Sequence, residues 1–279
     1  MLRGLYTAAS GMLTQQRRVE MLTNNIANAN TPGYKADQAA LRAFPELLLS
    51  RLDAANVSAK TPRSFLLQPA IGSFNTGVYM QELIPNFRQG DIKETGQRTD
   101  IALVNGTLPV DAATGQQGAL FFVVQNENGD IRYTRNGNFT MNPQGFLTTN
   151  DGWYVLDENG RRIQLPSADF TVSTDGTITA GNNRIARINI ALAANPNTLV
   201  KEGNGLFRSD NGALPSALGN PNVTYALRQG FIERSNVDLD RTMTELLSAY
   251  RAFEANQKIV QAYDRSMDKA VNEVGRLRS

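Results

Sequence analysis

The feature that most constrains this chain is where its prolines lie. All eleven prolines fall between Pro32 and Pro221, so residues 1–31 and 222–279 contain none. Proline interrupts a helix interior, and most of the glycines also fall in the middle of the chain. The distribution therefore predicts helical ends around a β-rich centre.

The C-terminal segment has the clearest helical pattern. Ser235 and Asp238 have the spacing of a capping box, which predicts Ser235 as the N-cap residue. Apolar residues then alternate at steps of four and three, the heptad pattern of packed helices. A helix over about 237–275 would be roughly 60 Å long, more than a compact domain of this size readily buries along one side. The expected seam residues are Leu239, Met243, Leu246, Tyr250, Phe253, Val260, Met267 and Val271.

The N-terminal segment repeats this design, with a heptad seam of its own. Gly4 and Gly11 each weaken that helix by roughly 1 kcal/mol relative to alanine, so it needs a partner, and the obvious one is the C-terminal helix. Both helices carry large apolar residues beside the seam, which favours burial against additional helices. An ordinary bundle within one subunit is the alternative, although the sequence shows only two long helical patterns. The N-terminal seam residues are Leu5, Met12, Val19 and Ile26.

The middle of the chain has the pattern of short antiparallel strands joined by tight turns. The β-rich runs are separated by dipeptides that suit type I′ hairpin turns. These dipeptides are Asn128-Gly129, Asn136-Gly137, Asp151-Gly152, Asn159-Gly160 and Asp175-Gly176.

These patterns predict an α+β fold. Terminal helices at 1–33 and 234–279 would form a discontinuous coiled-coil inner domain, and residues 76–214 an inserted antiparallel β-rich outer domain. Residues 34–75 and 215–233 would connect the two. Within the connector we expect a short helix over Phe44–Leu52 and an extended or irregular Ser58–Phe74.

The end of the N-terminal helix is unusually well specified. In "NNIANANTPGYK" (24–35), amides of Asn28 and Asn30 can bond the last helical carbonyls, which otherwise have no partner. Thr31-Pro32-Gly33-Tyr34 then fits a type II turn, because Pro32 presets φ and Gly33 accepts φ > 0. Such a turn directs the chain out of the helical region, although a plain helix stop has the same local chemistry.

The composition excludes much of enzyme chemistry. The chain has no cysteine and no histidine, so thiol nucleophiles, disulfides, the commonest metal ligand and the usual general base are missing. Carboxylate pairs such as Asp238/Asp240 and Asp157/Glu158 are better explained by a helix N-terminus and a turn. We expect no catalytic residues, cofactor or metal. A net charge of +2 without pooled basic residues disfavours nucleic acid.

Targeting signals are also weak by sequence. The N-terminus lacks the continuous apolar stretch of a cleavable signal peptide. The longest apolar run, Ala119–Val124, is far shorter than the roughly 20 residues of a membrane helix. We therefore expect no direct membrane insertion.

Four ordered stretches resemble the rod and hook proteins of the bacterial flagellar basal body. They are "NNIANANTPGYK" (24–35), "QGDIKETGQRTDIALVNG" (89–106), "YTRNGNFTMNPQGFLTTNDGWYVL" (133–156) and the closing segment 229–271, with its "SNV" and "RAFEAN". The small β-domain is most similar to the distal-rod type. A departure is the segment Thr107–Gly118, about a dozen residues that many members lack.

The resemblance implies a structural role. Members of this family pack their terminal helices into the inner wall of a hollow tube that transmits torque and conducts exported subunits. They leave the cell through the flagellar type III export apparatus without peptide cleavage, which would place this chain in the envelope-spanning basal-body rod. The implied partners are copies of itself, other axial rod and hook proteins, and that apparatus. Peptidoglycan and ring proteins stay open as further partners.

The main alternative is a binding module. The aromatic residues around Tyr133, Phe139, Phe146, Trp153 and Tyr154 could line a peptidoglycan-binding face, with the helices serving for oligomerisation. Hydrogen exchange separates the two interpretations. A polymer subunit alone in solution should leave residues 1–30 and 240–279 unprotected and protect 76–215, whereas a module should protect its helices.

Overall fold

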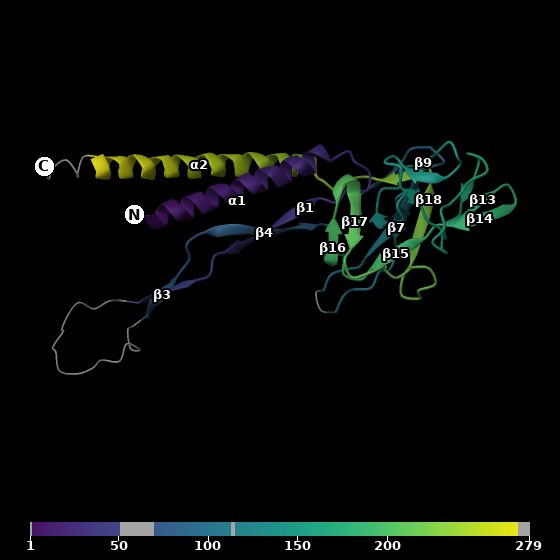
Figure 1. The fold of residues 1–279 in the computed structure, drawn as a ribbon, viewed down its shortest axis with the longest axis horizontal. Coiled ribbons are helices and arrows are strands. Elements are labelled where there is room, and N and C mark those ends of the chain that lie inside the picture. The colour runs from purple at the N-terminus through teal and green to yellow at the C-terminus, as the bar shows by residue number, and fades with distance from the viewer. Residues whose placement is uncertain (1, 51–69, 113–114, 273–279) are drawn as a thin grey trace. The chain divides into compact units, whose positions relative to one another are not determined.

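The computed structural model describes residues 2–50, 70–112 and 115–272 (Figure 1). Two long helices and many antiparallel strands make the fold class α+β, as the sequence predicts. Internal contacts divide the chain into two compact units. The first unit is Met1–Thr23, Ala39–Leu83 and Met243–Ser279, and the second is Asn24–Gln38 and Ile84–Thr242. Neither of the helices in the described ranges has the length and apolarity needed to cross a membrane.

Helix α1 is Leu2–Ala27 and helix α2 is Leu239–Asn272. The predicted cap of α2 was wrong. Asp238 is the capping residue, because its Oδ1 accepts a hydrogen bond from the Arg241 N–H at 3.1 Å. Ser235 instead accepts from the Val237 N–H at 3.3 Å in a turn before the helix. Residues 234–238 have no regular secondary structure and bond within the second unit, for example from the Arg234 N–H to the Asp91 carbonyl at 2.8 Å, so the helix begins only after Asp238.

In the first unit, α1 and α2 pack antiparallel. Met21 and Leu22 of α1 and Ala249 of α2 form a small buried core, and Val19 and Leu246 flank it. A β-carbon added at Gly4 would overlap the Tyr263 ring, and one added at Gly11 would lie 3.0 Å from Asn256. A position seven residues later in α1 therefore contacts a residue seven positions earlier in α2, as an antiparallel pair requires.

A second surface of α1 is covered by a strand ribbon. The Thr7 hydroxyl donates to the carbonyl of Thr76 at 2.9 Å, and the Thr14 hydroxyl donates to that of Val78 at 3.0 Å. Ser10, between them on the helix, lies against Gly77. The ribbon consists of β1 (Asp37–Ala43) paired with β4 (Val78–Pro85).

The predicted short helix at Phe44–Leu52 was wrong where the structure describes it. Leu47–Ser50 is strand β2, paired antiparallel with β3 (Ala70–Phe74). Three consecutive leucines suit helix or strand equally, and here pairing with a distant segment decides. In the predicted connector Ser58–Phe74, residues 58–69 lie outside the described range.

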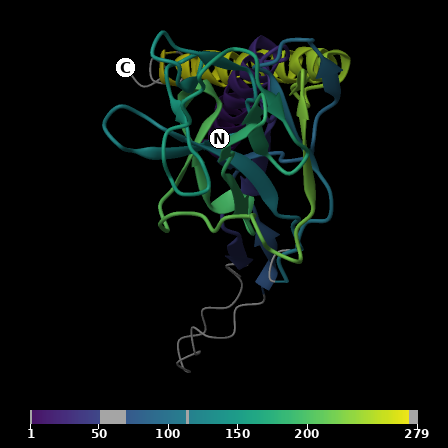
Figure 2. The same ribbon diagram turned by 90° about the vertical axis from the view of Figure 1, so that its right-hand side faces the viewer.

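The second unit is built almost entirely of antiparallel strands (Figures 1 and 2). Its largest sheet has the order β16-β17-β8-β7-β11-β10-β9, with β15 also paired to β7. Residues 215–233, the expected connector, contain β18 and β19, which pair with β6 and β5. The 3₁₀ turns are η1 (Pro196–Thr198) and η2 (Gly203–Gly205). The strands of this unit are β5 (Ile92–Glu94), β6 (Ile101–Asn105), β7 (Ala119–Gln125), β8 (Ile131–Thr134), β9 (Phe139–Met141), β10 (Leu147–Thr149), β11 (Tyr154–Val155), β12 (Thr171–Val172), β13 (Thr177–Ala180), β14 (Asn183–Arg187), β15 (Ile190–Ala193), β16 (Leu199–Lys201), β17 (Leu206–Ser209), β18 (Tyr225–Gln229) and β19 (Phe231–Glu233).

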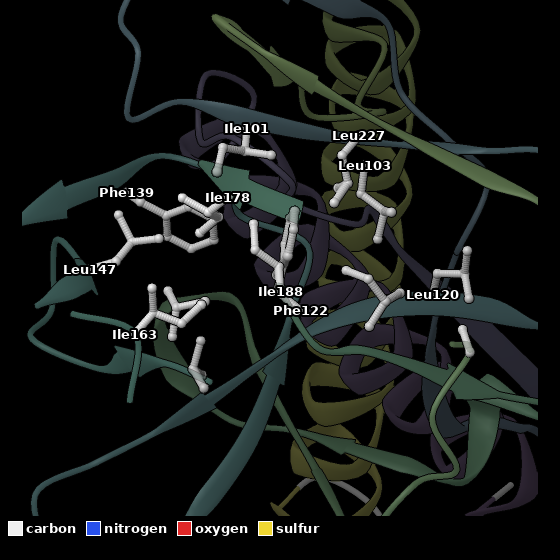
Figure 3. Packing of buried hydrophobic residues seen from close by; sticks show 14 of the residues in the cluster. Ile101, Leu103, Leu120, Phe122, Phe139, Leu147, Ile163, Ile178, Ile188 and Leu227 are labelled. Carbon is white, nitrogen blue, oxygen red and sulfur yellow. The ribbon is translucent and has the colours of Figure 1, made fainter. Parts of the chain in front are cut away.

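Strand β7 explains the longest apolar run in the sequence. Alternate side chains of a strand point to opposite faces. Phe122 enters the main core with Ile101, Leu147 and Ile178 (Figure 3), whereas Phe121 enters a second core with Tyr133 and Phe207. Because β7 is buried on both faces, its sequence is continuously apolar instead of alternating.

The predicted hairpins are present at four of the five dipeptides, but the predicted turn type was wrong. Type I′ needs φ > 0 at both central residues, whereas Asn204 is the one non-glycine residue with φ > 0 in the described ranges. At Gly129, Gly152, Gly160 and Gly176 only the glycine is left-handed, and its N–H bonds the carbonyl three residues before. Asn136-Gly137 closes no hairpin, because it joins β8 to β9, which do not pair with each other.

Candidate functional site: a buried ionic junction and exposed helix faces

The turn after α1 has the geometry that its sequence predicts. The Tyr34 N–H donates to the Thr31 carbonyl at 3.3 Å, and Gly33 has φ = 68°, as a type II turn requires. Asn28 Nδ2 donates to the carbonyl of Asn24 at 2.9 Å, but this carbonyl also accepts the Asn28 N–H at 3.1 Å, so the side chain adds a second bond to a carbonyl that already has a partner. Asn30 is exposed.

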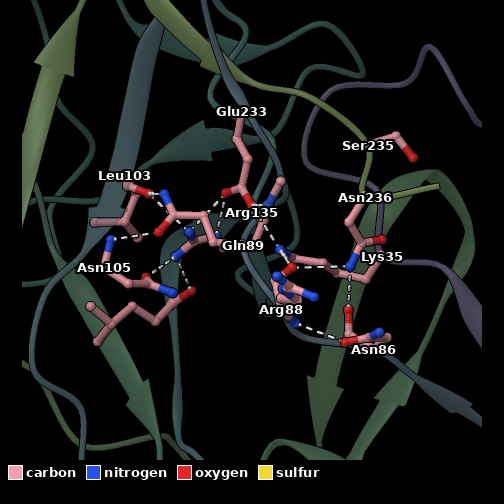
Figure 4. A network of polar contacts seen from close by, with 12 residues as sticks. Lys35, Asn86, Arg88, Gln89, Leu103, Asn105, Arg135, Glu233, Ser235 and Asn236 are labelled. Atoms are coloured by element: carbon pink, nitrogen blue, oxygen red, sulfur yellow. Dashed lines mark hydrogen bonds and ion pairs between the residues drawn. The ribbon is translucent and has the colours of Figure 1, made fainter. Parts of the chain in front are cut away.

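Directly after this turn lies a buried ionic cluster, which we call the junction: Lys35, Arg135 and Glu233 (Figure 4). One oxygen of the Glu233 carboxylate accepts from Lys35 Nζ at 2.7 Å and from the Gly90 N–H at 2.9 Å. The other oxygen pairs with Arg135 at 2.7–2.8 Å. All three side chains are at most 2% exposed. Two cations therefore share one carboxylate away from water.

Every remaining donor direction of Arg135 is also used. Its Nη1 donates to Asn105 Oδ1 at 2.9 Å and to the Leu120 carbonyl at 3.0 Å, and its Nη2 donates to the Leu103 carbonyl at 2.8 Å. Lys35 Nζ also donates to the carbonyl of Arg88 at 2.8 Å. A buried ion pair is stable only when such additional bonds satisfy its remaining polar groups. This one meets that condition.

The junction fixes the segment before α2 to the segment after α1. The Gly33 N–H donates to the backbone carbonyl of Glu233 at 2.8 Å, and the Ala36 N–H donates to Asn236 Oδ1 at 2.8 Å. Asn236 Nδ2 then donates to the carbonyl of Asn86 at 2.7 Å. Residues about 200 positions apart in the chain are thus held side by side within the second unit.

A second polar cluster lies beside the turn. The Tyr34 hydroxyl donates to Asn25 Oδ1 at 3.1 Å, and Asn25 bonds both backbone groups of Asp37 at 2.9 Å. Lys201 pairs with the Asp37 carboxylate at 2.8 Å and lies 4.2 Å from the centre of the Tyr34 ring. Burial, and then the neighbouring Asp37, raise the pKa of Tyr34 well above its ordinary value, so its hydroxyl stays protonated.

Charge balance in the junction is reflected in its pKa values. Burial lowers the pKa of Lys35 to about 8, since the Glu233 carboxylate only partly offsets it and Arg135 lowers it further. Burial by itself would raise the pKa of Glu233, but Arg135 and Lys35 outweigh it, and the net pKa lies below the ordinary value. At neutral pH the carboxylate is ionised and holds both cations.

The expected seam residues fall into two groups. Leu5, Met12, Val19 and Ile26 of α1, and Leu246, Phe253, Val260 and Met267 of α2, are partly buried. Leu239, Met243, Tyr250 and Val271 are exposed by 48%, 50%, 51% and 72%. Three further large residues beside the seam, Tyr6, Leu13 and Leu247, are exposed by 65%, 56% and 59%. Within the described ranges, both helices therefore carry apolar faces that stay exposed.

Sequence reasoning missed two features of this region. Gly4 and Gly11 were interpreted only as weak helix formers, whereas they make room for Tyr263 and Asn256 of α2. Their seven-residue spacing was the available signal. The junction was missed because Lys35, Arg135 and Glu233 are far apart in sequence, although each lies in a stretch quoted above.

The chain thus combines two long terminal helices with a β-rich unit in which the junction holds residues 33–36 beside residues 233–236. Three family models match: a flagella basal body rod protein model over residues 5–35, the D1 domain of the flagellar hook protein FlgE/F/G over 117–180, and the C-terminal model of flagellar basal body rod FlgEFG proteins over 228–273.

Relatives match along the whole chain. The chain is 50% identical to the flagellar hook-basal body complex protein FlhO of Bacillus subtilis, over 99% of this chain and 100% of that one. It is 31% identical to the flagellar basal-body rod protein FlgF of Caulobacter vibrioides, over 98% of both. It is 30% identical to FlgG of B. subtilis, over 98% and 99%. The chain belongs to the flagellar basal-body rod and hook family, as a structural subunit of the basal body.

Proposed function

We propose that this subunit polymerises into the hollow helical rod of the basal body, which transmits torque to the hook and conducts exported subunits. Its terminal helices form the inner coiled-coil wall, and the β-rich unit lies outside. One observation carries the proposal: large apolar side chains on both terminal helices, including Tyr6, Leu13, Leu247 and Tyr250, are more than half exposed. Large exposed apolar patches mark interaction sites.

The energetics favour assembly through these faces. Fully burying a side chain such as leucine contributes about 1.5–3 kcal/mol. Leu239, Met243, Leu247 and Tyr250 follow one another along α2 at helical spacing, so they form one stripe. Burying several such side chains together offsets the conformational entropy cost of ordering two helices. A single antiparallel pair leaves these side chains exposed and so does not gain this free energy.

The partners follow from this role. Copies of the chain and other axial rod and hook proteins contact the helices, and the flagellar type III export apparatus delivers the subunit without cleavage. The role is structural and requires neither catalysis nor a cofactor.

Tyr250→Asp tests the proposal most cleanly. Tyr250 is 51% exposed in the subunit, so aspartate is harmless in a lone copy but places an unpaired charge in the assembled wall. We expect loss of rod completion and of motility. Leu246→Asp should have the same result, but Leu246 also packs against α1, so its effect on the subunit itself is larger.

Ser248→Asp is the matched control, because Ser248 is exposed on α2 outside the apolar stripe. Its rods should form normally. Unfolding followed through Trp153, the single tryptophan, should be unchanged in both variants. Normal motility with Tyr250→Asp would contradict the proposed wall.

A further inference from the structure

The second unit contains a hollow of about 560 Å³, and none of the described residues that line it belongs to helix α1 or α2. It lies between the end of β4, the segment that follows it, the start of β7 and the turn η1. Ligand sites commonly have volumes of about 300–1,000 Å³. Its lining includes Phe87, Arg88, Gln89, Asn105, Gln117 and Asn197.

The lining has an unusual chemical composition. Among the described residues that line it, carboxamides dominate, Arg88 is the one charged side chain, and there is no carboxylate. Each carboxamide offers two donors and an acceptor oxygen, so such a wall suits a ligand with hydroxyl and amide groups. Without carboxylates it does not suit a cation. The Arg88 guanidinium makes no ion pair within the described ranges, and it can take a carboxylate of the ligand.

Part of this wall is held rigidly. Gln89 Nε2 donates to the Leu103 carbonyl at 3.2 Å, and its Oε1 accepts from the Asn105 N–H at 3.0 Å (Figure 4). Asn105 Oδ1 in turn accepts from Arg135 of the junction. In contrast, the side chain of Asn197 and the exposed side chain of Gln117 make no hydrogen bond within the described ranges. The hollow thus combines a fixed wall with free carboxamides.

Residues Gln116–Gly118, at the end of the segment between β6 and β7, supply one side of the hollow. Its described ends pair as a hairpin: the Asp111 N–H donates to the Gln116 carbonyl at 2.8 Å, and the Gly118 N–H donates to the Pro109 carbonyl at 2.9 Å. Asn195 Nδ2, just before η1, donates to Asp111 Oδ2 at 3.2 Å and anchors the hairpin. This hairpin between β6 and β7 therefore completes the hollow.

The same bonds argue against a peptide strand as the ligand. Strand addition needs an open row of backbone groups, but the N–H groups of Asp111, Gly115 and Gly118 bond carbonyls within this hairpin, so its described part offers only a short row. Pro85 and Pro196, which also line the hollow, have no N–H to offer. Recognition must come from side chains.

We propose that this hollow binds a short stretch of an N-acetylated glycan that carries carboxylates. Gln117 and Asn197 bond its hydroxyl and acetamido groups, and Arg88 pairs with its carboxylate. Phe87, whose ring centre lies 5.8 Å from that of Phe121, offers an apolar surface at the wall. The inference does not depend on polymerisation, because the whole site lies within the second unit.

The test titrates the full-length monomer with two probes. One is the neutral tetramer of N-acetylglucosamine, and the other is the disaccharide of N-acetylglucosamine and N-acetylmuramic acid, which carries one carboxylate. We expect saturable binding of both, tighter for the disaccharide. Gln117→Ala and Asn197→Ala should each weaken it about threefold to tenfold, as the loss of one hydrogen bond does. Gln144→Ala, an exposed amide outside the hollow, should change nothing.

Arg88→Gln should remove the preference for the disaccharide and leave the binding of the tetramer intact. Unchanged Trp153 fluorescence shows that each variant is folded. Absence of binding by both probes, or binding that Gln117→Ala and Asn197→Ala leave unchanged, would overturn the site. Equal affinity of the two probes for the unaltered chain would overturn the role of Arg88.

Discussion

Glu233→Gln should destabilise the second unit far more than its small chemical change suggests. Glutamine keeps the shape and an acceptor oxygen, so the substitution removes little besides charge. Lys35 and Arg135, each 2% exposed, then remain buried without a counter-ion. Removing one partner of a buried pair costs about 3–5 kcal/mol, because the other charge is left uncompensated. Here two charges are left.

The assay is urea unfolding of the full-length monomer followed through Trp153, which packs against the main core of the second unit. With a urea dependence of about 2 kcal/mol per molar, the unfolding midpoint should fall by about 1.5–2.5 M. Glu158→Gln is the matched control, since Glu158 and Arg184 form an ion pair exposed by 36% and 58%. Such pairs contribute at most about 1 kcal/mol. Equal shifts of the urea midpoint in the two variants would show that the charge of Glu233 does not stabilise the junction.

Two further perturbations of the same region have distinct signatures. Gly33→Ala should cost more than Gly181→Ala in the same urea assay. Both glycines have φ > 0, but a β-carbon at Gly33 would lie 2.5 Å from the backbone of Arg135, whereas Gly181 has open space around it; equal losses would contradict the close approach. Stability should also rise with pH above about 8, because the pKa of Lys35 is about 8 when folded and 10.5 when unfolded, so the unfolded chain binds more protons in this window. The free energy of unfolding should be about 2 kcal/mol higher at pH 9.5, and this gain should be missing in Lys35→Met. Above about pH 10 the raised pKa of Tyr34 lowers the stability again. An identical pH profile for Lys35→Met would show that Lys35 is not the origin of the gain.

Local patterns predicted much of this fold. Heptad spacing and the absence of proline predicted both terminal helices, and Pro32-Gly33 predicted the turn that ends α1. Glycine-containing dipeptides predicted most hairpins. Their turn type was wrong because a single left-handed glycine closes a three-residue loop, which leaves the asparagine or aspartate before it in an ordinary conformation.

Long-range pairing was beyond the reach of such patterns. Thr7 and Thr14 of α1 bond carbonyls at the start of β4 and just before it, more than sixty residues away, and no local signal indicates that partner. Lys35 and Glu233 are separated by 198 positions. Each is an ordinary charged residue in its own segment, and only the folded backbone makes them a buried pair.

Hydrogen exchange on the monomer and on assembled rods tests the central claim, that other copies complete the terminal helices. In dilute monomer we expect rapid exchange over residues 2–23 and 243–272. Strong protection should cover β7 and the segment 24–38. The sequence alone predicts no protection up to about residue 30, but residues 24–38 belong to the second unit, so rapid exchange should end at Thr23. In assembled rods both helices should become protected. Helices as strongly protected in the lone monomer as in the rod would contradict the claim.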